Sequence, residues 1–132
     1  MISLLYRAAD VLRRRSFASD HGRLGEDLAH RYLRTHGCTI VARNYRPRSG
    51  GGEIDLVAWH GGKLIFVEVK TRASEEFGSP DRAVDAEKRA SLQFAARDYA
   101  CRANVAWQQT RFDIVSVVLQ GHPCVVWMTD AF

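Results

Sequence analysis

The stretches Gly52-Glu53-Ile54-Asp55-Leu56 and Phe66-Val67-Glu68-Val69-Lys70 decide the fold expected of this 132-residue chain. Side chains alternate along an extended strand, so Glu68 and Lys70 are expected on one face and the two valines on the other. If residues 53–59 and 63–70 pair as a hairpin that turns at residues 60–62, Asp55 lies close to Glu68 across the ladder. Two carboxylates and one amine are then expected to meet at one point.

This combination is what a metal-dependent phosphodiesterase requires. Mg²⁺ takes about six oxygen ligands and usually keeps several waters, so one or two carboxylates plus a substrate phosphate suffice. Asp55 and Glu68 fit that requirement, and the backbone carbonyl of Val69 adds a third protein oxygen. Lys70 is expected to hold the attacking water or to stabilise negative charge growing on the phosphate. The expected cofactor is Mg²⁺ or Mn²⁺.

A solvated strand face is the alternative interpretation, since cross-strand pairs of acids and lysine are common and weakly stabilising. The run Leu64-Ile65-Phe66-Val67, however, is apolar on both faces, which is typical of a buried central strand. Charges at the end of such a strand are unfavourable unless they are paired or bound to metal. The pattern therefore favours a site.

The remaining segments predict an α/β domain with five strands, in the order αβββαββ. A helix is expected over residues 22–36, with Leu24, Leu28 and Tyr32 as one stripe and Glu26 on another flank with Ala29 and Leu33. Pro80 is expected to open a second helix that runs to about Cys101 and buries Ala83, Val84, Leu92, Ala95, Ala96 and Tyr99. The other elements are a strand at 38–45, a glycine-rich loop at 47–52, a strand at 111–119 and an edge strand at 124–128.

The composition predicts a single domain, residues 21–132, preceded by a basic appendage, residues 1–20. Three cysteines, an odd number far apart in sequence, give neither a disulfide framework nor a zinc spacing, and the five histidines show no metal-ligand spacing. No segment reaches 18 uninterrupted apolar residues, so a cytoplasmic protein without a membrane partner is expected. The net charge of +4 is compatible with a polyanionic partner.

Several short motifs resemble the YraN family of small bacterial proteins, in the same order, from about residue 22 to residue 113. They are Gly22-x-x-Gly25-Glu26, Arg43-Asn44-Tyr45-Arg46, Gly52-Glu53-Ile54-Asp55-Leu56-Val57, Phe66-Val67-Glu68-Val69-Lys70-Thr71-Arg72, Phe77-Gly78 and Arg111-Phe112-Asp113. That family in turn resembles the restriction-endonuclease-like PD-(D/E)XK nucleases, and within them the archaeal Holliday junction resolvases. The resemblance implies a restriction-endonuclease-like fold, a central mixed five-stranded sheet flanked by helices.

The resemblance also implies roles for individual residues. Asp55 and Glu68 would be metal ligands, Lys70 the catalytic lysine and Glu26 the early-helix acid. If its helix packs over this end of the sheet, Glu26 would add a further ligand or orient a metal-bound water. Ile54 departs from the wider superfamily, which often has a non-ligating proline there.

Basic residues near these motifs are candidate nucleic-acid contacts. Arg43, Arg46 and Arg72 are expected around the glycine-rich loop and the end of the second hairpin strand. Lys88, which matches a lysine of the YraN pattern, is either a phosphate contact or a solvated helix charge. Asp113, beside Arg111, is expected to be an ion-pair or turn residue rather than a ligand.

Two functions follow from these expectations. The first is a metal-dependent endonuclease that hydrolyses DNA phosphodiester bonds, including those of branched DNA. The alternative is a non-catalytic nucleic-acid-binding or interaction module that retains the nuclease fold. A four-way junction substrate would imply a homodimer, because two opposed cuts require two sites.

Overall fold

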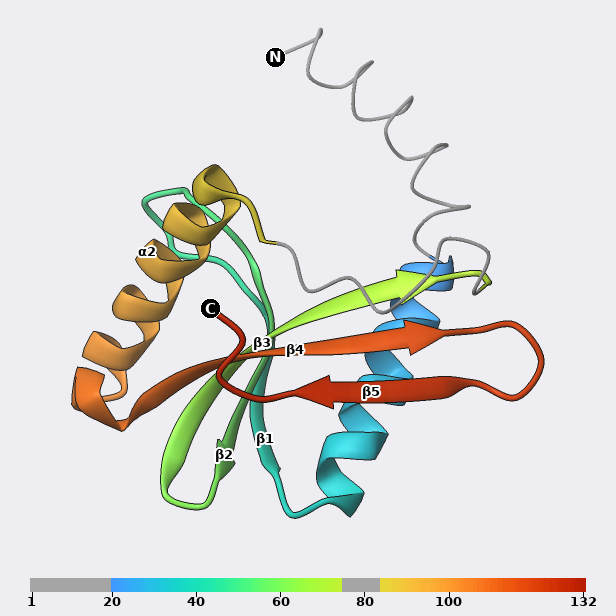
Figure 1. Cartoon of the computed structure of the whole chain (residues 1–132). Helices are drawn as coiled ribbons and strands as arrows, with labels where there is room; N and C mark the ends of the chain where they lie inside the picture. The colour runs from blue at the N-terminus through green and yellow to red at the C-terminus, as the bar shows by residue number, and fades with distance from the viewer. Residues whose placement is uncertain (1–19, 75–83) are drawn as a thin grey trace, which may run out of the picture.

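The computed structural model describes residues 20–74 and 84–132, which form one five-stranded sheet flanked by two α-helices (Figure 1). The sheet follows chain order: β1 (Thr39–Tyr45), β2 (Ile54–His60), β3 (Lys63–Arg72), β4 (Thr110–Val118) and β5 (Cys124–Met128). The helices are residues 20–35 and α2 (Ala86–Arg102), and a short 3-10 turn, η2 (Trp107–Gln109), leads into β4. Because β3 and β4 run parallel and the other pairs antiparallel, the expected mixed sheet with the order αβββαββ is confirmed, with β5 at an edge.

The hairpin between β2 and β3 has the expected pairing. His60 pairs with Lys63, which leaves Gly61 and Gly62 as a two-residue turn with φ angles of 55° and 78°. Tight hairpin turns of this kind need positive φ at both central positions, and glycine adopts it without strain. The turn fixes the register, in which Leu56 lies opposite Val67.

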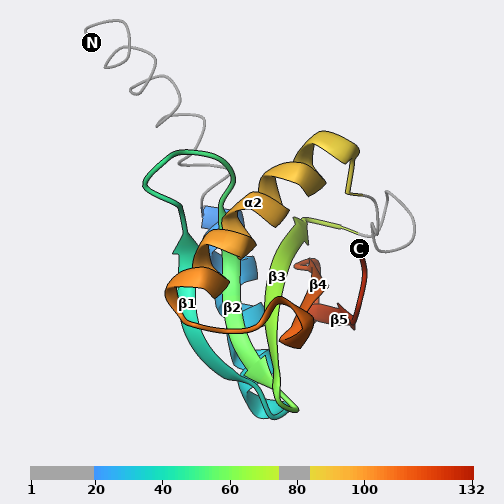
Figure 2. The ribbon, with the colours of Figure 1, turned by 90° about the vertical axis from the view of Figure 1, so that its left-hand side faces the viewer.

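The two helices cover opposite faces of the sheet (Figure 2). On one face Ala29 and Leu33 of the 20–35 helix pack with Leu56, Ile65 and Val67. On the other face α2 packs Leu92, Ala95, Ala96 and Ala100 with Val57, Leu64 and Phe66. Strand β3 thus contributes alternate residues to both clusters, so it is the buried central strand that its apolar run predicts.

The buried face of the 20–35 helix differs from the expected one. Leu24 is 48% exposed, whereas Ala29 and Leu33 are fully buried and Gly25 lies on the same side. Gly25, Ala29 and Leu33 have the same four-residue spacing as Leu24, Leu28 and Tyr32, so periodicity alone does not choose between the two faces. The face with Gly25 and Ala29 is the buried one, because these small residues let the helix approach the sheet closely.

Helix α2 begins later than expected. Val84 and Asp85 are not helical, and the Asp85 carboxylate accepts a hydrogen bond of 2.7 Å from the Lys88 amide as the N-cap. An aspartate here satisfies an amide that has no partner within the helix. Val84 and Tyr99 are half-buried rather than buried, and Ala100 is buried in addition. The expected appendage over residues 1–20, save Asp20, lies outside the described residues, as do Phe77-Gly78, Pro80 and Ala83.

The expectation for Asp113 is confirmed. Its carboxylate is fully buried and accepts hydrogen bonds from the Arg111 guanidinium at 2.7 and 2.8 Å, Trp127 Nε1 at 2.9 Å and the Asp130 amide at 2.9 Å. Four donors compensate the burial of one charge. This network joins β4 to β5 and to the C-terminal segment.

The three cysteines are free thiols, with Cys38 buried and the other two exposed. In the part of the chain that the structure describes, no helix has the length and apolar character needed to cross a bilayer.

Candidate active site

The structure brings Asp55 and Glu68 together. The β2–β3 register, continued one step beyond the Leu56–Val67 pair, puts Asp55 opposite Glu68. At this point the Asp55 side chain enters the ladder, because its Oδ2 accepts a hydrogen bond of 2.8 Å from the Val69 amide. The predicted convergence of the two carboxylates is thus a consequence of the hairpin.

Asp55 is held in an unfavourable environment for a charge. Burial, together with the negative charges of Glu68, Glu26 and Glu53, raises the pKa of its carboxyl group from 3.8 to about 8. The hydrogen bond from the Val69 amide opposes this shift without cancelling it. A cation beside Asp55 would favour the ionised form.

Glu68 is the second acid of the pair, with only 11% of its side chain exposed. One oxygen, Oε1, lies 3.2 Å from Lys88 Nζ. The other, Oε2, is buried and has no hydrogen-bond partner among the described residues. Buried carboxylate oxygens are ordinarily satisfied, so Oε2 marks the place where a further positive group fits.

Lys70 follows two residues later on β3 and is half-buried. Leu64 and Phe66 belong to the cluster beneath α2, so alternation places Glu68 and Lys70 on that same side of the sheet. Val67 belongs to the opposite cluster, and Val69 packs against it. The prediction that Glu68 and Lys70 share one face of β3 and the two valines the other is confirmed.

Glu26 approaches the pair from the 20–35 helix. A methyl group added at Gly25 would lie 2.8 Å from Thr71 Cγ2, so the helix contacts the end of β3 directly at this glycine. The Glu26 carboxylate accepts hydrogen bonds from Asn44 Nδ2 at 3.2 and 3.4 Å and lies 3.5 Å from Arg43. Glu26 is close enough to raise the pKa of Asp55, but its own partners are on β1.

The basic candidates have different environments. Arg43 also forms a 2.9 Å ion pair with Asp27, and the largely exposed Arg46 forms one of 2.9 Å with Glu53. Arg72 is half-buried at the end of β3, and its Nε has no hydrogen-bond partner among the described residues. Lys88, half-exposed on α2, is the only one of the four that contacts the acid pair.

The donor set fits a hard divalent cation with two protein carboxylates. Asp55 and Glu68 supply charged oxygens side by side, and the buried Oε2 supports a ligand at that place. Across residues 20–74 and 84–132, no group of three or more His, Cys, Asp or Glu side chains is arranged to hold a metal. The assignments of the Val69 carbonyl and of Glu26 as further ligands stay predictions.

Two residues near the site were missed by sequence reasoning. Asn44 adopts a φ of 52° and donates to Glu26, and its place in the Arg43-Asn44-Tyr45-Arg46 motif was the available signal. Asparagine tolerates this left-handed conformation better than most residues. Glu53 adds negative charge near Asp55, which its position two residues earlier made foreseeable.

Comparisons with a family model and with known proteins point to the same family. A model of an uncharacterised protein family, UPF0102, matches residues 25–117. A UPF0102 protein of Solibacter usitatus is 66% identical over 132 residues and covers the whole of both chains. Another, from Koribacter versatilis, is 48% identical over 114 residues, which are 84% of this chain and 78% of that protein.

A third relative, from Hahella chejuensis, is 38% identical over 113 residues, which are 86% of this chain and 90% of that one. The region matched by the family model contains the acid pair, Lys70, Glu26 and Lys88. The chain belongs to the UPF0102 family, which is the YraN family that its motifs resemble.

Proposed function

We propose that this protein is a Mg²⁺- or Mn²⁺-dependent endonuclease that hydrolyses phosphodiester bonds of DNA, including branched DNA. Membership of the family brings no activity with it, so the proposal depends on the site itself. The observation that carries it is the Asp55–Glu68 pair, two acids side by side, with a buried carboxylate oxygen that has no hydrogen-bond partner among residues 20–74 and 84–132. Such a pair is unfavourable for folding alone and suits a divalent cation and a phosphate.

Each residue has a distinct part in the proposed reaction. Asp55 and Glu68, with the Val69 carbonyl, would hold the cation, which supplies Lewis-acid polarisation of the scissile phosphate when bound. Lys70 orients the attacking water or stabilises negative charge on the phosphate. Lys88, which pairs with Glu68, would contact a phosphate once that carboxylate has another positive partner.

A non-catalytic module with the same fold is the competing interpretation. Loss of an acid or of the lysine would favour it, since binding alone does not require all three groups. Asp55, Glu68 and Lys70 are all present, and the two acids are held together. This supports the enzyme over the binding module.

The test is cleavage of labelled linear, flapped and four-way-junction DNA by the purified protein with Mn²⁺, Mg²⁺ or EDTA. We expect cutting that requires the divalent ion. Asp55→Asn and Lys70→Met should each lower the single-turnover rate by about 100-fold or more, the usual effect of removing a group that stabilises the transition state.

The control variant is Asp98→Asn, which removes an acid on α2 that is paired with Arg102 and Tyr45, away from the acid pair. It should cut like the unaltered protein. Absence of cutting on every substrate, or equal rates for Asp55→Asn and Asp98→Asn, would contradict the proposed function.

A further inference from the structure

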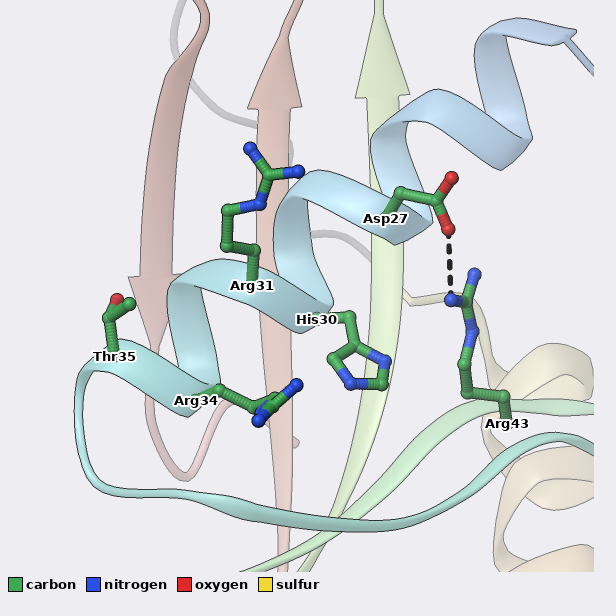
Figure 3. Close-up of a pocket in the computed structure, with 6 residues that line it drawn as sticks. All are labelled: Asp27, His30, Arg31, Arg34, Thr35 and Arg43. Carbon is green, nitrogen blue, oxygen red and sulfur yellow. Dashed lines mark ion pairs between the residues drawn. The ribbon is translucent and has the colours of Figure 1, made fainter.

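A second concentration of positive charge lies on the outer side of the 20–35 helix, beside β1. It lines a pocket of about 400 Å³ formed by Asp27, His30, Arg31, Arg34, Thr35 and Arg43 (Figure 3). Five of these residues come from the helix, where spacings of three and four residues bring side chains to one side. Arg43 comes from β1 and completes the pocket.

The pocket carries an excess of positive charge. Arg43 is paired with Asp27 at 2.9 Å and lies 3.5 Å from Glu26. Within the described ranges, no acidic side chain forms an ion pair with Arg31 or Arg34. Two arginines are therefore left to attract an anion, and guanidinium groups match the oxygens of a phosphate better than any other side chain.

His30 lies between the side chains of Arg34 and Arg43 (Figure 3). Its Nδ1 is buried and has no hydrogen-bond partner in the described part of the chain. Burial, followed by the positive charges of Arg43 and Arg34, lowers the pKa of His30, so its ring is neutral at neutral pH. A neutral imidazole between two guanidinium groups offers a hydrogen bond to an anion that the arginines attract.

The pocket is connected to the candidate active site through one side chain. Arg43 contacts Asp27 in the pocket and Glu26 beside the acid pair. Along the helix axis, His30 and Arg34 lie about 6 and 12 Å from Glu26, at 1.5 Å per residue. With a rise of about 3.4 Å per nucleotide, this corresponds to roughly two to four nucleotides of one DNA strand.

We propose that this pocket binds a backbone phosphate of the nucleic-acid substrate, a few nucleotides from the bond at the acid pair. The inference depends on the proposed function for the identity of the ligand. Arg34, Arg43 and His30 hold the phosphate, while Arg31 and Thr35 complete the lining of the pocket. The pocket thereby sets the path of the strand across the 20–35 helix.

The experiment measures binding without catalysis. Fluorescence anisotropy of a labelled DNA duplex is recorded in EDTA at several salt concentrations, for the full chain and for Arg34→Gln, Arg34→Lys and Arg102→Gln. Arg34 is exposed, so its replacement should leave folding intact, which thermal unfolding checks. Arg102→Gln makes the same change of charge on α2, across the sheet from the pocket.

We expect Arg34→Gln to weaken binding about 5-fold relative to Arg102→Gln. The slope of log affinity against log salt should fall by about 0.9, the value of one phosphate contact. Arg34→Lys should restore most of the affinity, because it keeps the charge. Equal affinities and slopes for Arg34→Gln and Arg102→Gln would overturn the inference, as would an absence of DNA binding by the unaltered chain.

A parallel measurement with inorganic phosphate separates two sources of the anion. Phosphate could raise the melting temperature of the unaltered protein but not that of Arg34→Gln, while both proteins bind DNA equally well. In that case the pocket binds a free anion and the inference is wrong. Because EDTA prevents metal-dependent cutting, this result is independent of the cleavage assay. DNA binding through Arg34 can therefore be established even if Asp55→Asn has no effect on cleavage.

Discussion

At Asp55, burial and the neighbouring negative charges both oppose ionisation of the carboxyl group. None of the described residues that raise or lower its pKa is basic. Within the described part of the chain, the contact that favours its charged form is the hydrogen bond from the Val69 amide. A carboxylate in such a position lowers the stability of the folded state whenever it is charged. Retaining it is consistent with a role in function rather than in folding.

The pKa of Asp55 gives a prediction about pH. A folded-state pKa of about 8, against an ordinary 3.8, means that the folded protein keeps a proton which the unfolded chain loses. The contribution of Asp55 to stability should therefore fall as pH rises from about 4 to 8, by at most about 1.4 kcal/mol per pH unit. Asp55→Asn, measured by thermal unfolding in EDTA, should be more stable than the unaltered protein at pH 8 and similar to it at pH 4.

Asp98→Asn is the control, because the pKa of Asp98 is shifted in the opposite direction to that of Asp55. Hydrogen bonds from Tyr45 and Arg102 lower the pKa of Asp98, so its charge favours folding above its ordinary pKa. This variant should gain no stability at pH 8. If Asp55→Asn is no more stable than the unaltered protein at pH 8, the charged form of Asp55 does not destabilise the fold and the prediction is wrong.

At the scale of elements, the hairpin and the 20–35 helix show what sequence patterns can and cannot predict. The β2–β3 hairpin was predictable because its turn is two adjacent glycines and its strands follow directly. Its register then gave the Asp55–Glu68 pair without further information. The local part of the site was therefore available from the sequence alone.

The face of the 20–35 helix was not predictable in the same way. Leu24 and Ala29 belong to stripes of equal period, and the choice between them depends on the sheet beneath. The partners of Glu26 on β1 lie about eighteen residues away, and no local pattern pairs them. The predicted start of α2 was wrong for another reason. Pro80 and Asp85 are both acceptable signals for a helix start, and α2 begins after Asp85, which caps it.

Gly25 gives a prediction for this helix. A Cβ at residue 25 would lie 2.8 and 2.9 Å from Thr71 Cγ2 and Cβ, closer than real contacts allow. Gly25→Ala should therefore destabilise the protein by about 1–3 kcal/mol despite the better helix propensity of alanine. Because the helix must move away from β3, Glu26 would move with it. Denaturant unfolding measures the change in the free energy of unfolding.

Gly22→Ala is the matched control on the same helix, since nothing lies within 4 Å of a Cβ there. It should stabilise the protein by up to about 1 kcal/mol, the helix-propensity difference between the two residues. Equal stabilisation by both alanines would contradict the close contact between the helix and Thr71.

At the scale of the whole molecule, charge is distributed unevenly. The chain has a net charge of +4, yet the negative charges of Glu26, Glu53 and Glu68 all act on the Asp55 carboxyl group. The basic pocket lies farther along the same helix as Glu26. A positively charged protein attracts nucleic acid and repels free cations, so a divalent ion should bind only where acids are gathered.

This distribution predicts a specific response of the whole fold to metal. A ligand that binds only the folded state stabilises it, by about 2.7 kcal/mol at a concentration of one hundred times its dissociation constant. Mg²⁺ or Mn²⁺ at neutral pH and constant ionic strength should therefore raise the melting temperature. Asp55→Asn and Glu68→Gln should each abolish most of that increase, while Asp98→Asn should keep it. If all three variants show the same increase as the unaltered protein, the ion does not bind at the acid pair. If none of the four proteins shows an increase, the pair holds no divalent ion in the absence of substrate.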